Sequence, residues 1–534
     1  MNTAKSIPII IGVTGHRTIR EEDRPAIRAA VKTELEKLRA LCPHSPLVML
    51  NSLAEGADLL CADVAEELGL PIVAVLPRER VAYERDFSDS ARERFAHHCA
   101  RAERVLVAPA AEKKAEETEE RNFQFRQAGI YVVEHSHVLL ALWDGGEGAA
   151  AACGTAAAVD FVLRGSFRPL SGVPVRSANN EAVIHIFTPR GERAEEKAGT
   201  IHVLGNRTAV WELLKKTDEF NRLSSELAVQ KRRLIPGDEE KDDVLKRMEQ
   251  VYLAASALSG RAAKQYRRIL AALALTATVL TLAFLLYDEA QALGMILVCG
   301  AMLLAARRLI RTAAVSDCHG KYVEYRALAE AVRVQSFLYY AGADIQAAEL
   351  FSWTQQEETA WIMAALYALT ITNSPKHSRD ILDCWVRQQR AYHRRAGRRV
   401  QHDARISSRL VKGALILSVA LYVLAVIFEL LCGGLLFQPV ILVPGAEICR
   451  TVLKIAMGSL SAITLFAANY YGKMSLPRRG SDHTKMERFY LKMEEQLQQF
   501  GQTDELLTAL AREEVNENGN WLSYQRDNTP DLSL

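Results

Sequence analysis

Four short segments of the chain carry polar or charged side chains, three of them together with glycine, in a way that suits phosphate binding. They read GVTGHR, NSLAEGAD, LPR and LWDGG, and the last continues through alanines to Gly154 and Thr155. Glycine lets backbone N–H groups approach a ligand closely, and a helix N-terminus favours an anion. We therefore predict a ligand site made of these residues: Gly12, Thr14, Gly15, His16, Arg17, Ser52, Glu55, Gly56, Asp58, Arg78, Asp144, Gly145, Gly146, Gly154 and Thr155.

Each segment taken singly also has an ordinary structural explanation. A glycine turn is usually loop punctuation. Asp58 could be only the N-cap of the helix that follows it, and His16 with Arg17 could be a solvated pair. The argument for a site is that every segment follows a run of apolar residues, so that all four would meet at one edge of one sheet.

The runs that precede these segments belong to a regular alternation over residues 7–188. Short apolar runs rich in β-branched residues alternate with helical patterns such as residues 25–41 and 58–68. This alternation predicts an α/β fold with a doubly wound parallel sheet, which binds ligands outside the carboxyl ends of its strands. The expected strands are residues 7–13, 46–51, 71–76, 104–108, 137–143 and 182–188.

The segments GVTGHR, SLAEGAD and WDGG, with the following Gly154-Thr155, resemble the SLOG superfamily, whose Rossmann-like sheets are related to the LOG proteins. The resemblance covers about residues 5–190. LOG enzymes carry a Pro-Gly-Gly-x-Gly-Thr-x-x-Glu loop and cleave nucleoside 5′-monophosphates. The resemblance thus implies a nucleotide-type ligand held through Gly145-Gly146 and Gly154-Thr155. The position of the catalytic glutamate falls on Ala158, with Asp160 two residues further, which implies binding without hydrolysis.

The second half of the chain contains long apolar runs that could cross a bilayer. We predict four spans, at residues 269–287, 294–306, 413–437 and 452–471. Clusters of Lys and Arg lie before the first and third spans and after the second and fourth, and such clusters mark the cytoplasmic side. The sequence therefore predicts a multi-pass membrane protein with both termini in the cytoplasm. Glu429 and Lys454 would lie near the outer interface, where they could pair or extend toward water.

The membrane portion is similar to SLATT proteins, two-span effectors found beside SLOG domains in bacterial conflict systems. This resemblance implies a homo-oligomer in contact with membrane lipid, located in the bacterial inner membrane, that acts in anti-phage defence. It suggests two two-span units, although an internal duplication is not evident. The predicted organisation is a SLOG-like domain (1–206), a helical linker (207–264), a first two-span unit (265–350), a cytoplasmic helical section (351–410), a second two-span unit (411–505) and a cytoplasmic tail (506–534).

Three functions remain open from the sequence. The first is a membrane effector gated by a nucleotide-derived signal. The second is a membrane-anchored nucleotide hydrolase, in which Asp144, Glu55 or Asp58 would replace the missing glutamate as acid or base. The third is a membrane scaffold whose site-like loops bind nothing.

Composition argues against several other classes of protein. Lys and Arg number 66 against 64 Asp and Glu, so we expect no nucleic-acid partner. The nine cysteines form no Cys-x-x-Cys pair, and no His-Glu-x-x-His pattern occurs. The two close histidine pairs, His97-His98 and His135 with His137, have no carboxylate or cysteine at a metal-binding interval in the sequence. We therefore predict neither a metal nor a cofactor.

Overall fold

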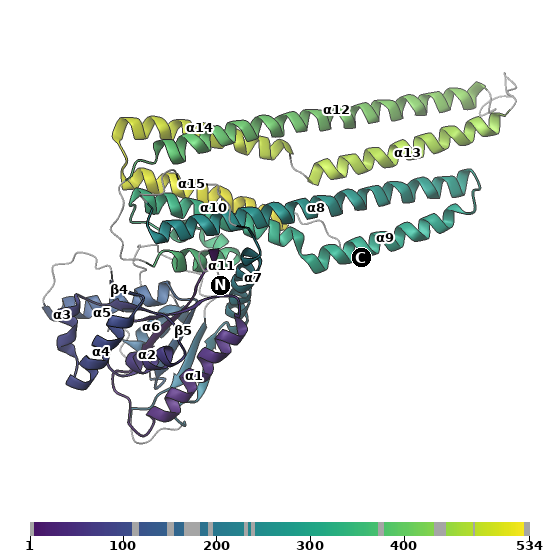
Figure 1. Cartoon of the computed structure of the whole chain (residues 1–534). Helices are drawn as coiled ribbons and strands as arrows, with labels where there is room; N and C mark the ends of the chain where they lie inside the picture. The colour runs from purple at the N-terminus through teal and green to yellow at the C-terminus, as the bar shows by residue number, and fades with distance from the viewer. Residues whose placement is uncertain are drawn as a thin grey trace. The chain divides into compact units, whose positions relative to one another are not determined.

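The computed structural model divides the chain into two compact units, described separately below (Figure 1). The sheet unit comprises Met1–Leu258, Tyr325–Ile381 and Gln502–Ser523, and the helical unit comprises Ser259–Glu324, Leu382–Gly501 and Tyr524–Leu534. The structure describes residues 5–108, 117–146, 154–164, 182–190, 196–228, 233–235, 241–371, 379–431, 445–473 and 476–527.

The sheet unit is built on a seven-stranded sheet with the order β4-β3-β2-β1-β5-β6-β7. All neighbouring strands are parallel except β6 and β7, which are antiparallel. The predicted α/β class and its six strands are confirmed; β7 was not predicted. The strands are β1 (Ile9–Gly15), β2 (Leu47–Asn51), β3 (Ile72–Leu76), β4 (Arg104–Val107), β5 (Val138–Trp143), β6 (Ala182–Phe187) and β7 (Ile201–Gly205).

Helices cover both faces of this sheet. β2 and β3 are buried along their whole length, as central parallel strands must be when helices pack on either side. Right-handed crossovers bring α1, α2 and α4 to one face, where they pack on one another, and α5 and α6 to the other. The helices between the strands are α1 (Arg24–Leu41), α2 (Ala57–Glu67), α3 (Arg80–Tyr83), α4 (Asp89–Arg101), α5 (Glu117–Glu134) and α6 (Thr155–Arg164).

Later parts of the chain complete the core of the sheet unit. Asn221 of α7 (Arg207–Ser225) is buried, accepts a hydrogen bond from the Ile7 N–H at 2.8 Å and donates one to the Ile7 carbonyl oxygen at 2.8 Å. α7 also packs on α11 (Trp353–Leu369). Arg333 of α10 (Cys318–Ala341) contacts Glu514 of α15 (Asp504–Asp527) at 3.0 Å. The segment just before β1 is therefore held by helices far along the chain.

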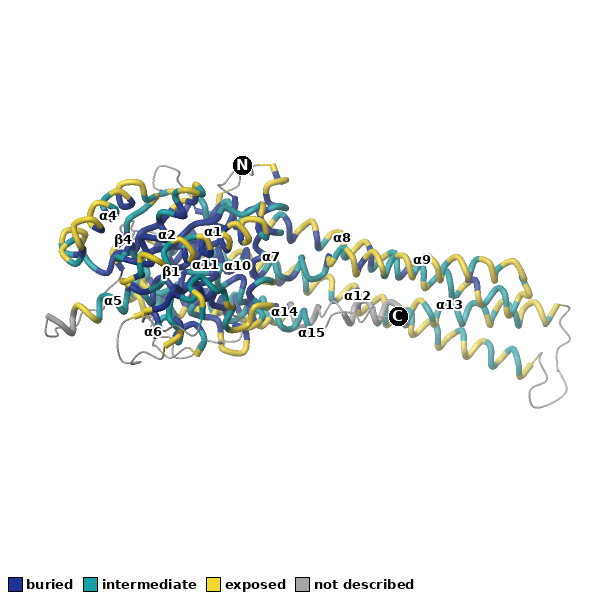
Figure 2. The backbone as a smooth tube through the Cα atoms, turned by 90° about the horizontal axis from the view of Figure 1, so that it is seen from below, coloured by how far each residue is buried: buried dark blue, intermediate teal, exposed yellow. Residues whose placement is uncertain are grey.

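The helical unit consists of long helices with many exposed residues, coloured yellow along α8, α9, α12 and α13 in Figure 2. Many of these exposed residues are large and apolar. Leu297 of α9 is 77% exposed and Ile416 of α12 is 69% exposed. Its helices are the part of α8 (Asp243–Glu289) from Ser259 onward, α9 (Met295–Ser316), α12 (Gln388–Leu431), α13 (Ala446–Lys473) and α14 (Leu476–Phe500). α12 follows the π-helical turn Leu382–Arg387 directly and packs along both α13 and α14.

Two helical stretches, Asp243–Glu289 and Leu382–Leu431, are long and apolar enough to cross a membrane. Their most apolar 18-residue windows have mean hydropathies of 2.5 and 2.6, and 17% and 0% of those windows is buried. These two stretches therefore do not fit the core helices of a soluble protein, because the apolar residues of a core helix would be buried in the interior.

Four spans were predicted, and within the described residues the structure supports only these two. The predicted second span is short, and α9, which contains most of it, continues into Arg307, Arg308 and Arg311. Part of the third prediction, residues 432–437, lies outside the described residues, and so do the side chains of the fourth from residue 465 onward.

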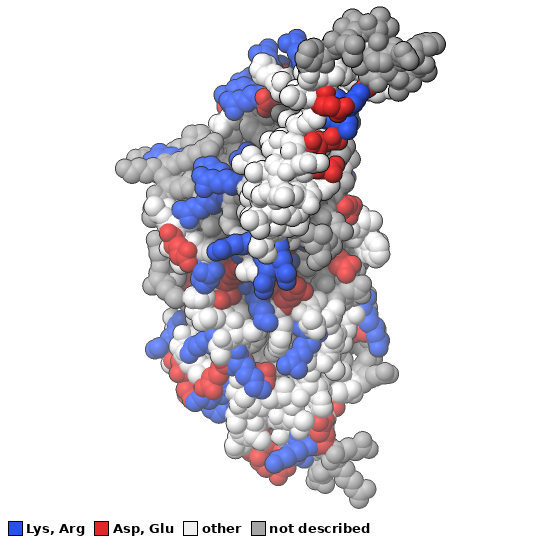
Figure 3. Space-filling view, turned by 90° about the vertical axis from the view of Figure 1, so that its right-hand side faces the viewer, with Lys and Arg blue, Asp and Glu red and all other residues white. Residues whose placement is uncertain are grey.

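Ion pairs join the ends of the long apolar helices. The Arg450 guanidinium donates to both carboxylate oxygens of Glu429, at 2.6 and 2.9 Å. The Lys454 ammonium lies 2.9 Å from Glu289, so it links α13 to α8 rather than to Glu429. Figure 3 shows an extended white, uncharged surface on these helices with red and blue groups at its margins. Glu429 and Lys454 are therefore each paired with another charged residue, Arg450 and Glu289, rather than with each other.

Candidate functional site

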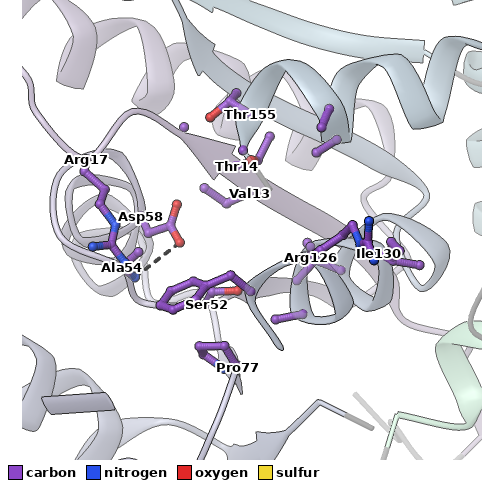
Figure 4. Close-up of a pocket in the computed structure, with 18 of the residues that line it drawn as sticks. Val13, Thr14, Arg17, Ser52, Ala54, Asp58, Pro77, Arg126, Ile130 and Thr155 are labelled. Carbon is purple, nitrogen blue, oxygen red and sulfur yellow. Dashed lines mark hydrogen bonds between the residues drawn. The ribbon is translucent and has the colours of Figure 1, made fainter. Parts of the chain in front are cut away.

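The candidate site lies where the strand order reverses. β1 has β2 on one side and β5 on the other, so the chain leaves β1 toward one edge of the sheet and later returns to build the opposite half. A crevice opens at the carboxyl ends of the strands at such a position. A cavity of about 450 Å³ occupies this place (Figure 4). Its volume falls within the usual range for small-molecule pockets.

The cavity brings together about half of the predicted site residues. The end of β1 and the residues after it contribute Thr14, Gly15, His16 and Arg17. The segment between β2 and α2 and the start of α2 contribute Ser52 and Asp58, and the start of α6 contributes Gly154 and Thr155. The other predicted residues are not part of its wall: Gly12, Glu55, Gly56, Arg78, Asp144, Gly145 and Gly146.

Two of the predicted glycines outside the wall have packing roles. A Cβ atom on Gly12 would lie 2.2 Å from the hydroxyl oxygen of Ser136, so only glycine fits between β1 and the end of α5. Gly56 has a φ of +93°, and a Cβ there would lie 2.2 Å from the carbonyl oxygen of Arg17. Both glycines let backbone segments approach closely and thereby position the residues that do line the cavity.

Two charged residues outside the wall are held by partners elsewhere. The Glu55 carboxylate accepts a hydrogen bond from the Ser88 hydroxyl at 2.6 Å. Arg78 forms an ion pair with Asp86, which lies after β3 in the short helical segment before α4. Glu55 and Arg78 therefore order the rim loops rather than face the cavity directly.

Asp58 is the carboxylate among the described cavity residues. The β2–α2 turn that carries it is tightly bonded: Asn51 accepts from the Leu53 N–H at 2.7 Å, and donates to the Asp58 carbonyl oxygen at 2.9 Å. Leu53 has a φ of +54°, a strained conformation for a non-glycine residue. Burial raises the pKa of Asp58 to about 7, although the Ala54 N–H and Arg17 favour the charged form. Asp58 is therefore able to hold or release a proton near neutral pH.

His16 lies between two charged groups at the ends of β5 and β6. Arg190 lies 2.6 Å from His16 Nδ1, and His16 Nε2 lies 3.1 Å from the Asp144 backbone N–H nitrogen and 3.2 Å from Asp144 Oδ1. Burial and then Arg190 lower the pKa of His16, against the opposing effect of Asp144. The His16 ring lies between Asp144 and Arg190. Both His16 and Arg190 line the cavity.

Asp144 and the two glycines after it form a turn below this group. The Gly146 N–H donates to Asp144 Oδ1 at 3.1 Å, and Gly145 adopts a φ of +77°. Burial acts to raise the pKa of Asp144, but the Gly146 N–H and His16 outweigh it and hold the pKa below its usual value. Asp144 therefore carries a charge in neutral solution and acts through His16.

A basic and aromatic wall from α5 faces this group across the cavity. Arg17 lies over the Phe125 ring at 5.1 Å from its centroid, and Arg121 lies 5.7 Å from it. Arg126 and Arg190 also line the cavity, so arginines outnumber its one carboxylate, Asp58. Cations at the mouth of an apolar, low-dielectric pocket attract and hold anions.

The N-terminus of α6 completes the wall. Thr155 is the first residue of α6 and is buried, and the Ala158 N–H bonds to the Gly154 carbonyl oxygen at 3.0 Å. Ala158, the position of the catalytic glutamate in the LOG pattern, also lines the cavity. The first N–H groups of a helix are free to bind an anion, and the helix dipole adds to their effect. The inserted residues 147–153 lie outside the described residues.

Sequence reasoning missed Arg190 and the whole α5 wall. A signal for α5 was present, because a helix that follows a parallel strand begins at the carboxyl edge of the sheet, and its early residues read RNFQFR. Arg190 follows β6 at the same edge, and the sequence search did not select it although Gly191 comes directly after it.

The sequence also gave no sign that carboxylates of α2 lie beside the histidines of α4. Glu66, His97 and His98 present ligand atoms within 4.8 Å of one another, although in the sequence the histidines are 31 residues from Glu66. The prediction of no metal site rested on spacing along the chain. Packing of α4 on α2 produces a group that such spacing does not reveal.

No protein-family model matches this chain, and no curated protein matches its sequence. The function must therefore be argued from the cavity and from the long apolar helices.

Proposed function

We propose that this protein is a membrane effector gated by a nucleotide-derived signal that binds in the cavity at the carboxyl edge of the sheet. The observation that carries the proposal is the cavity itself. Arg17, Arg121, Arg126 and Arg190 surround a space with one carboxylate, and the first residues of α6 also line it. Phe125 adds a flat apolar surface on which a base can stack.

The form of the ligand follows from this distribution of groups. An anionic part, such as a phosphate or pyrophosphate, binds between the α6 N-terminus and the arginines. An aromatic base lies against Phe125 or Tyr83. The resemblance to SLOG domains agrees with this assignment, and Ala158 at the glutamate position favours binding over cleavage.

The effector role rests on the exposed apolar helices. At least the two stretches on α8 and α12 insert in the bilayer, and α9 and α13 return the chain as hairpins, with both termini in the cytoplasm. Ligand binding changes the packing of homo-oligomers, as the SLATT resemblance implies, and the bacterial inner membrane loses its integrity during anti-phage defence. The alternative of a passive scaffold assigns no role to the cavity.

A nucleotide hydrolase is the second candidate, and Asp58 favours it. Of the three carboxylates considered as substitutes for the glutamate, Glu55 is bonded to Ser88 and Asp144 acts through His16, whereas Asp58 faces the cavity. A pKa of about 7 lets Asp58 act as a general acid at neutral pH.

The test uses the full chain in detergent and in dye-loaded liposomes. Thermal stability is measured with AMP, ADP-ribose and cyclic di-AMP, and each ligand is then recovered for mass spectrometry. We expect one of them to stabilise the protein, to be recovered intact and to release dye. Cleaved ligand would instead support the hydrolase, and no saturable binding of any anionic nucleotide would refute both proposals.

Two variants connect the binding to the cavity. Arg17→Ala should weaken binding by about 10- to 100-fold, because a hydrogen bond to a charged group contributes about 1.5–3 kcal/mol. Arg28→Ala is the matched control, since Arg28 forms only an exposed ion pair with Glu67 on the outer face of α1. Equal affinities for these two variants would place the ligand elsewhere.

A further inference from the structure

The last turn of α2 and the last turns of α4 form a compact group of carboxylates and imidazoles. Asp63 and Glu66 lie three residues apart and therefore share one face of α2. His97 Nε2 lies 2.9 Å from Glu66 Oε2, and His98 Nδ1 lies 3.6 Å from the same oxygen. His98 Nε2 lies 2.8 Å from Asp63 Oδ1. None of these four residues lines the nucleotide cavity.

His98 occupies an unusual position, because both of its ring nitrogens face carboxylate oxygens. The side chain is 2% exposed, so water does not surround it. If Nε2–H donates to Asp63, the lone pair of Nδ1 points toward Glu66 Oε2, and two acceptors face each other. A second proton or a metal ion between them removes this repulsion.

We propose that Glu66, His97 and His98 bind a divalent transition metal ion of the zinc type, with Asp63 orienting His98. Tetrahedral coordination at about 2.0–2.1 Å separates neighbouring ligand atoms by about 3.3 Å. The two observed nitrogen-to-oxygen distances, 2.9 and 3.6 Å, lie on either side of this value. Imidazole and carboxylate ligands suit Zn²⁺, and water supplies the fourth position.

Asp63 completes the arrangement that metal-bound histidines usually have. A carboxylate that accepts the other ring N–H of the histidine sets its tautomer and raises its basicity. Here Asp63 accepts from Nε2 of the buried His98, so that Nδ1 is the free coordinating atom. Burial acts to raise the pKa of Asp63, but His98 and Arg94 outweigh it and keep the carboxylate charged.

Two arginines balance the charge of the group without occupying the coordinating atoms. Arg101 contacts Glu66 Oε1 at 2.8 Å, and Arg94 contacts Asp63 Oδ2 at 2.5 Å. Arg101 therefore shares Glu66 Oε1 with His97 Nε2, which lies 3.1 Å from it, and leaves Oε2, the oxygen near both histidines, without a guanidinium contact. Arg101 is 65% exposed and can move into solvent, which would let both oxygens of Glu66 bind the ion. The arginine competes with the metal, so its removal should strengthen binding.

The metal would tie α4 to the end of α2 opposite the cavity. Glu66 lies eight residues after Asp58 in α2, or roughly 12 Å along the helix. A bound ion would therefore fix the two helices that hold the Asp58 turn and the rim segment before α4. This site does not depend on the nucleotide proposal, because its ligands are separate.

The test is Zn²⁺ binding to the full chain in detergent after treatment with a chelator, measured by competition with a chromophoric zinc indicator. We expect one high-affinity equivalent per chain. His97→Ala removes a half-exposed ligand without disturbing the core and should weaken that equivalent about 100-fold. Asp63→Asn should weaken it about 10- to 100-fold, and Arg101→Gln should strengthen it several-fold. Co²⁺ in the same site should give the intense visible bands of tetrahedral coordination.

The matched control is His202→Ala. His202 is also half-exposed and paired with a carboxylate, Glu196 at 2.5 Å, but the described residues around it supply no third ligand. This variant should keep the affinity of the unaltered protein. Equal Zn²⁺ binding by His97→Ala, His202→Ala and the unaltered chain would overturn the proposal.

Discussion

Asp58→Asn should make the stability of the protein less dependent on pH, and the size of the effect follows from the burial of this carboxyl group. Its pKa rises from 3.8 to about 7, mainly through burial. A pKa above the unfolded value means that the folded state binds the proton more tightly, so stability decreases as pH rises from about 4 to 7 and is constant above. About three pKa units at about 1.4 kcal/mol each give about 4 kcal/mol.

The asparagine variant removes the free-energy cost of keeping a charged carboxylate in a buried position, because it carries no charge at any pH. Its amide oxygen can still accept a hydrogen bond from the Ala54 N–H. At pH 8 it should therefore be more stable than the unaltered protein by about 4 kcal/mol, or roughly 10 °C in Tm at roughly 2–4 °C per kcal/mol. Near pH 4 the two proteins should differ little, because Asp58 is then protonated.

The assay is thermal unfolding of the full chain in detergent from pH 4 to 8.5. The quantity of interest is the difference in Tm between Asp58→Asn and the unaltered chain, since the histidines contribute equally to both. Asp89→Asn is the control, because Asp89 is 98% exposed. A Tm difference that stays constant with pH would refute the assignment of a neutral carboxyl group to Asp58.

Three further predictions concern residues around the cavity and the helix ends. Gly56→Ala should lower stability by about 1–3 kcal/mol because of its positive φ, and thermal unfolding measures the loss. Glu55→Gln should change the affinity for an anionic nucleotide by less than about threefold, because Glu55 contacts Ser88 outside the cavity. A larger loss of affinity, measured by titration, would contradict this prediction. Lys454→Glu should place two carboxylates together at Glu289 and raise basal dye release from liposomes, whereas unchanged leakage would show that this pair does not hold α8 and α13 together.

The strand ends were predictable because glycine and polar residues follow apolar runs in a recognisable pattern. Thr14, Arg17 and Thr155 line the cavity at the positions that the parallel sheet requires. The same rule selected Arg78 and Glu55 as well, but no sequence pattern indicates that Asp86 and Ser88 bind them. Pairing between residues in loops depends on tertiary packing that periodicity does not encode.

The remaining differences arise from contacts between segments far apart in the sequence. Asn221 bonds to Ile7 across 214 residues, so α7 belongs to the sheet unit, although the predicted first domain ends at residue 206. β7 pairs antiparallel with β6 and has an irregular burial pattern, which hid it from a search for fully apolar strands. Four spans were predicted, whereas among the described residues two helical stretches are long and apolar enough to cross a membrane.

The continuity of α12 has a mechanical consequence. Its 44 residues extend over about 66 Å, about twice the hydrocarbon thickness of a bilayer. If its apolar end lies in lipid, the other half of the same rod, which packs along α14, must stand in water. A helix without a break is stiff, so a tilt or axial turn applied to the aqueous half is transmitted undiminished to the lipid half. α12 would then act as a lever, and the bilayer surface would be its fulcrum.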